Sequence, residues 1–154
     1  MEKYLERIAS FTSAKQCEAF EKNARQRGEE ALADAAARRR VEILATKHGG
    51  STPAEREGWM AINAYEETLF RKHGKRIRAG RTRQMINRLG MVPAIEKMVS
   101  EREWDTQGAT ALYEVGLGEF TFEAIVVRHP DEFTEFALKQ AKDKLAQSAK
   151  EREP

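Results

Sequence analysis

The chain has 154 residues, of which 40% are hydrophobic and 34% are charged. This length suits one domain with one core, and the composition excludes a disordered chain and a membrane-spanning protein. Net charge is only +2 and Cys17 is the single cysteine, which excludes an internal disulfide and a zinc site of paired cysteines. The first residues lack a signal-peptide pattern, so the sequence predicts a cytoplasmic protein with Cys17 as a buried apolar residue.

Helical periodicity begins at the N-terminus. Apolar side chains recur at helical spacing and predict a short amphipathic helix over residues 2–11. Ser13 and Gln16 form a capping box for a long helical stretch that ends near Lys47. Gly28 predicts either a kink in this stretch or its division into two helices. A stripe of small residues at helical spacing would let another helix approach closely, or support self-association: Ala24, Gly28, Ala31 and Ala35.

The central third contains the clearest helix start of the chain. Thr52, Pro53 and Glu55 supply the cap, the first helical position and the capping-box acid of a helix that ends near Gly74. Residues on its predicted inward side are Trp59, Ile62, Tyr65, Glu66 and Leu69. A short helix is predicted from about Thr82 to Gly90, and Pro93 is expected to open the next helix, with Ile95, Met98 and Val99 inward.

The C-terminal third is more ambiguous. A helix is predicted from Thr106 to Gly116, followed by residues 119–127, whose alternation also fits a strand. Helix is the preferred interpretation, because no second strand is evident to pair with this segment. A last helix is expected from about Pro130, with its inward side formed by Phe133, Phe136 and Ala137.

Together these elements predict an all-α fold. We expect a single compact bundle-like domain of about six or seven helices over residues 1–148, with a basic loop and short-helix segment in its middle. Residues 149–154 are expected to form a frayed polar tail.

Charge is strongly segregated along the chain. Residues 71–88 contain eight bases and no acid, which leaves 19 of the 27 bases to face 25 acids elsewhere. Such a segment suits contact with phosphates, and arginine can also read guanine edges. The predicted nucleic-acid-binding residues, with Gln84 and Asn87 as candidate base readers, are Arg71, Lys72, Lys75, Arg76, Arg78, Arg81, Arg83, Gln84, Asn87 and Arg88.

The sequence leaves several partners open for this basic segment. The first is nucleic acid, with DNA favoured over RNA. The second is an acidic protein surface, or pairing of the bases with the chain's own acids. A membrane partner is disfavoured because exposed aromatics do not interleave with the bases. Residues 82–99 also weakly resemble a helix-turn-helix, although an ordinary helical corner fits better, with Arg81, Arg83 and Arg88 facing outward.

Motifs for catalysis are not recognisable. The three histidines lack metal-ligand spacing, and His48 and His73 fit positions near helix C-termini. Glu66 and Glu67 could hold a divalent ion together with Glu55 and Glu57, but a solvated helix surface is the better interpretation. No phosphate-binding glycine loop or nucleophile elbow occurs. The sequence therefore favours a non-enzymatic accessory or regulatory protein, or alternatively an adaptor or inhibitor, without a cofactor or metal.

Overall fold

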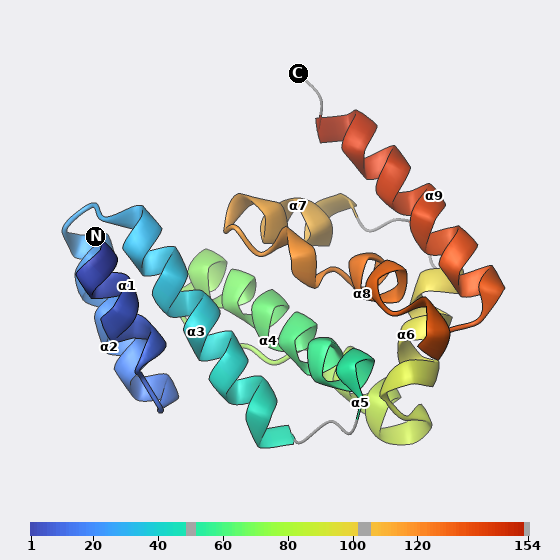
Figure 1. Cartoon of the computed structure of the whole chain (residues 1–154), viewed down its shortest axis with the longest axis horizontal. Helices are drawn as coiled ribbons and strands as arrows, with labels where there is room; N and C mark the ends of the chain where they lie inside the picture. The colour runs from blue at the N-terminus through green and yellow to red at the C-terminus, as the bar shows by residue number, and fades with distance from the viewer. Residues whose placement is uncertain (49–51, 102–105, 153–154) are drawn as a thin grey trace. The chain divides into compact units, whose positions relative to one another are not determined.

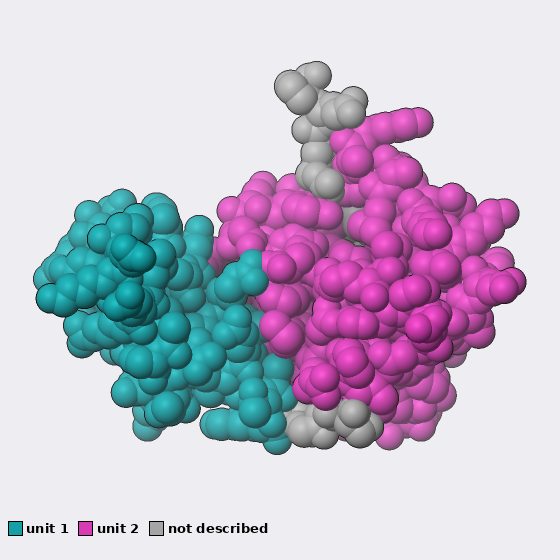
Figure 2. All heavy atoms as spheres, in the orientation of Figure 1, with its two compact units in different colours: residues 1–49 teal, residues 50–154 magenta. Residues whose placement is uncertain are grey.

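The computed structural model describes residues 1–48, 52–101 and 106–152. Regular structure in these ranges is entirely helical, with nine α-helices, two short 3-10 helices and no strand (Figure 1). The predicted all-α class is therefore confirmed. The chain divides into two compact units, residues 1–49 and 50–154, which Figure 2 distinguishes by colour. Each unit is described separately below, and the single domain over residues 1–148 stays a prediction. No helix in the described ranges is both long and apolar enough to cross a membrane.

The N-terminal unit consists of α1 (Glu2–Ala9), α2 (Ala14–Gln26) and α3 (Glu30–His48). The predicted capping box starts α2: the Ser13 hydroxyl accepts from the Gln16 N–H, and the Gln16 side chain accepts from the Ser13 N–H. Apolar faces of the three helices meet in one core that includes Ile8, Phe11, Cys17 and Leu32. Cys17 is completely buried, as predicted, and burial raises the pKa of its thiol.

Gly28 divides the long helical stretch into two helices. Its φ of +74° lies in the left-handed region, which glycine adopts without a steric penalty. The Glu29 N–H donates to the Ala24 carbonyl and the Gly28 N–H donates to the Arg25 carbonyl, which is the Schellman pattern. The chain reverses here, so α2 and α3 pack against each other (Figure 1). The predicted stripe of small residues therefore does not run along one continuous helix.

The C-terminal unit is built around α4 (Pro53–His73). The Thr52 hydroxyl accepts from the Glu55 N–H, and Pro53 takes the first helical position, as predicted. Small side chains on α4 are buried, and at Gly58 an added Cβ would lie 2.4 Å from the Met91 sulfur. The elements that follow are α5 (Gly80–Leu89), α6 (Met91–Glu101), α7 (Thr106–Glu114), a 3-10 turn (Gly118–Phe120), α8 (Phe122–Arg128), a second 3-10 turn (Pro130–Glu132) and α9 (Glu135–Arg152). Of these, α6, α7, α8 and the first 3-10 turn pack on α4, and α9 packs on α6 and α8.

The ambiguous segment 119–127 is helical in its larger part. The Thr121 hydroxyl accepts from the Ala124 N–H and so caps α8, in which Ile125 and Val126 are buried. The helical interpretation is confirmed for residues 122–127, while residues 119 and 120 belong to the preceding 3-10 turn.

The prediction that Phe136 faces inward is wrong, because its side chain is 60% exposed. The last α-helix starts at Glu135 rather than near Pro130. Because the starting residue determines which side chains of a helix face the core, the expected inward side is misplaced at Phe136. Its buried residues are Ala137, Ala141, Lys144 and Ser148, which recur at helical spacing. Residues 149–152 of the expected tail continue this helix, and the last two residues lie outside the described ranges.

Candidate functional site

The basic segment, residues 71–88, occupies a chain reversal in the C-terminal unit. It comprises the last turn of α4, a connection over residues 74–79, and most of α5. Gly74 ends α4 with a φ of +74°, a left-handed conformation that turns the chain back beside the helix it has just left. This reversal brings the bases of the connection and of α5 near two adjacent acids of α4, Glu66 and Glu67.

Arg83 turns inward and binds Glu66. Its Nε and Nη2 atoms donate to the two carboxylate oxygens of Glu66, each at 2.8 Å, which is a bidentate pair. Both side chains are largely buried, with 17% and 14% of their surfaces exposed. The prediction that Arg83 faces outward is therefore wrong. The local sequence suggested a polar surface position, whereas the reversal at Gly74 places a carboxylate beneath this residue.

Glu67 is completely buried and lies between two other bases of the segment. Its Oε2 accepts from Nη1 of Arg76 at 2.9 Å, and its Oε1 lies 3.7 Å from Nε of Arg71, one helical turn later. The Arg76 guanidinium also lies over the Phe70 ring, 3.7 Å from its centroid. The prediction that only Glu66 of this pair faces the apolar side, and that the acids form a solvated surface, is wrong. Burial of Glu67 is possible because arginines compensate its charge.

Glu66 also fixes the start of α5. The N-cap position is Ala79, which has no side chain able to cap, and its N–H donates instead to Oε2 of Glu66 at 2.7 Å. The carboxylate lies at the positive end of the helix, where a negative charge is favoured. Burial is the largest influence on the pKa of Glu66 and raises it, but the hydrogen bonds from Arg83 and Ala79 outweigh it, so the pKa is lowered. The pKa of Arg83 is raised in turn, chiefly by its hydrogen bond to Glu66.

This lowered pKa makes the stability contribution of Glu66 dependent on pH. A carboxyl group whose pKa is lowered in the folded state stabilises the fold at any pH above its ordinary, unfolded-state pKa. That contribution is lost as the pH falls through the lower pKa of the folded state. We expect Glu66→Gln to lower the free energy of unfolding by about 1–2 kcal/mol at neutral pH. Urea denaturation should show this difference shrinking between about pH 5 and pH 3. A difference that stays constant over this range would contradict the assignment.

Five exposed bases of the segment form no ion pair within the described part of the chain. Arg76 is exposed as well, but it is paired with Glu67. The five come from α4, the connection and α5: Lys72, Lys75, Arg78, Arg81 and Arg88. On α5, Arg81, Gln84 and Arg88 recur at i, i+3 and i+7, so they share one helix face, with Asn87 beside it. The opposite face carries Ile86, which is buried. The two candidate base readers are therefore both exposed and adjacent to two unpaired arginines.

The corner between α5 and α6 is tighter than a helix-turn-helix. Gly90 alone separates α5 from α6, whereas the DNA-binding motif has a turn of about three or four residues. The Gly90 φ of +92° permits this sharp connection. Residues 82–99 thus form the ordinary helical corner that the sequence favoured.

Titratable groups elsewhere in the described ranges do not assemble a metal site. No group of three His, Cys, Asp or Glu side chains there is placed to hold a metal ion. Glu57, which the sequence offered as a possible ligand, instead binds Arg128 at 2.6 Å and contacts His129. His73 lies in the last turn of α4, as predicted, and the side chain of His48 lies outside the described residues.

Comparison of this chain with protein-family models, with curated proteins and with solved structures finds no match. A proposal of its function therefore depends on the residues and geometry of the basic segment. One pairing in that segment had a signal in the sequence, since Glu67 and Arg71 are spaced i and i+4. The pairings of Arg76 and Arg83 span 9 and 17 residues, and only the folded chain brings them together.

Proposed function

We propose that this protein binds the phosphate backbone of nucleic acid, DNA in preference, as an accessory or regulatory protein. Gln84 and Asn87 contact base edges in this proposal. The phosphate contacts come from the five exposed bases that form no ion pair within the described part of the chain: Lys72, Lys75, Arg78, Arg81 and Arg88. Arg71, Arg76 and Arg83 hold the segment in place through the two glutamates of α4 and do not contact the ligand.

The observation that supports this proposal is that the eight bases differ in whether they are paired with a carboxylate of the protein. Three are paired with the protein's own carboxylates, while five are exposed and form no ion pair with a described residue. Buried carboxylates fix the connection and the start of α5, so the exposed bases are presented from a structured surface. Binding to such a surface loses less conformational entropy than ordering a flexible arm.

The dependence of binding on salt tests the proposal. A protein that neutralises five phosphates of duplex DNA has an expected slope of about −4.5 in log K against log salt, or roughly a 500-fold loss between about 50 and 200 mM. Fluorescence anisotropy with a labelled duplex of mixed sequence measures this slope. No binding at the lower salt concentration would reject the proposal, and a slope near −7 would show that the three arginines paired with Glu66 and Glu67 also contact phosphate.

An acidic protein surface is the alternative partner for the same five bases. Polyglutamate at equal charge concentration distinguishes the two, because it offers carboxylates without the spacing of a nucleic-acid backbone or any base edge. Much tighter binding of the duplex supports the proposal. Equal binding of the two polymers, unaffected by Gln84→Ala and Asn87→Ala, would favour an adaptor that docks on an acidic protein.

A further inference from the structure

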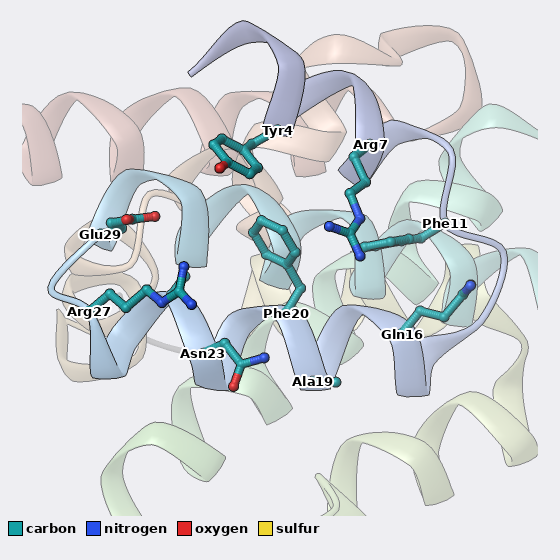
Figure 3. Close-up of a pocket in the computed structure, with 10 residues that line it drawn as sticks. Tyr4, Arg7, Phe11, Gln16, Ala19, Phe20, Asn23, Arg27 and Glu29 are labelled. Atoms are coloured by element: carbon teal, nitrogen blue, oxygen red, sulfur yellow. The ribbon is translucent and has the colours of Figure 1, made fainter.

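A groove in the N-terminal unit lies between α1 and α2, away in sequence from the basic segment (Figure 3). It has a volume of about 390 Å³. Figure 3 shows Tyr4 and Arg7 extending from α1 toward α2, from which Phe20 points back into the space. Arg7 and Arg27 stand on either side of Phe20 in this view, so the groove has an aromatic centre and basic flanks.

Aromatic rings form a continuous row in this groove. The Phe20 ring centroid lies 5.8 Å from that of Phe11 and 6.4 Å from that of Tyr4. Phe11 is buried in the core, whereas Tyr4 is 45% exposed. The row therefore leads from the core to solvent and offers a rigid apolar surface to a ligand.

The two flanking arginines have no ion pair with any described residue, although acids are available nearby. Arg25, one turn from the end of α2, binds Glu30 at 2.6 Å and also lies near Glu21 and Asp34. Arg7 and Arg27 are exposed and outside this cluster. Their charge is left for an external anion, although Glu29 also lines the groove and would repel an acid placed beside it.

The hollow surface continues beyond this groove. A second hollow of about 460 Å³ shares Tyr4 and Glu29 with the first and is also lined by Met1, Glu30 and Leu32. Met1 is 68% exposed and adds another apolar group to the surface. Two open hollows that share Tyr4 in their lining suit an elongated ligand better than a compact metabolite.

We propose that this groove binds an acidic peptide segment of a partner protein. The peptide packs a large apolar side chain on Phe20 and Tyr4 and places carboxylates against Arg7 and Arg27. This site is separate from the basic segment and does not depend on the nucleic-acid proposal. Rigid aromatic anchors flanked by exposed charges are a common arrangement at protein interaction sites.

Anisotropy with a labelled probe peptide, Glu-Asp-Glu-Leu-Phe-Glu-Asp-Glu, tests this site in the full chain. Arg7→Glu and Arg27→Glu should each weaken binding about tenfold or more, because the substituted carboxylate repels the peptide. Lys22→Glu is the matched control, since Lys22 is exposed on α2 outside the lining, and should change binding less than about twofold. Replacing Leu-Phe of the probe by Ser-Gly should weaken binding about tenfold.

Several results would overturn the proposal. One is the absence of measurable binding of the probe at low salt, and another is equal binding of the Ser-Gly probe. Loss of binding in Arg81→Glu/Arg88→Glu, with Arg7→Glu and Arg27→Glu unaffected, would place the probe on the basic segment instead. Direct binding of a labelled single-stranded oligonucleotide that is lost in Arg7→Glu but kept in Lys22→Glu would assign the groove to nucleic acid. Circular dichroism of each variant verifies that these exposed substitutions leave the helices intact.

Discussion

The double variant Arg81→Glu/Arg88→Glu is expected to bind a generic DNA duplex about a hundredfold more weakly than the natural protein at about 0.1 M salt. Each lost phosphate contact removes close to one unit from the salt slope, and the introduced carboxylates add repulsion. Both side chains are exposed on one face of α5 and pair with no described residue, so the fold should be unaffected. Anisotropy titrations at several salt concentrations give the affinity and the slope together.

A matched variant separates local contact from the change in total charge. Lys139→Glu/Lys142→Glu makes the same charge change at exposed positions of α9 in the same unit. It should alter affinity by less than about threefold, since at this salt concentration exposed charges act only over about 10 Å. Equal losses in the two double variants would mean that binding follows net charge, and the assignment of a site to α5 would fail.

Substitution of Glu67 is expected to have the largest effect on stability among the charged residues of the segment. Glu67→Ala leaves Arg71 and Arg76 without their shared carboxylate and opens space at a position with 0% exposure. Breaking a buried pair costs about 3–5 kcal/mol, and the partial exposure of the two arginines places the expected loss near the lower end, at about 3 kcal/mol. Urea denaturation followed by circular dichroism measures this loss.

Two further variants identify the cause of such a loss. Glu67→Gln keeps most of the volume and one acceptor, so it should be destabilised by less than Glu67→Ala. Asp143→Ala removes an exposed carboxylate from α9 and should change the free energy of unfolding by no more than about 0.5 kcal/mol. A Glu67→Ala protein as stable as Asp143→Ala would show that the buried carboxylate does not hold the segment.

Local sequence signals predicted helix starts well, because the groups involved are only three residues apart. Ser13 and Gln16 form the expected capping box, and the Thr52 hydroxyl caps the next helix by accepting from the Glu55 N–H. The burial of Cys17 was likewise predictable from its residue type. Errors arose where a helix face depends on where the helix begins, as in α9, whose late start at Glu135 leaves Phe136 exposed.

The sequence by itself determined that positive charge is concentrated in residues 71–88 and that the chain is helical, since both follow from composition and local spacing. Only the tertiary structure decided which bases remain available to a ligand. Arg76 and Arg83 meet glutamates 9 and 17 residues earlier, and those meetings depend on the path of the chain after Gly74. Helical periodicity shows which side chains share a face of one helix, so it contains no information about contacts made across a reversal of the chain.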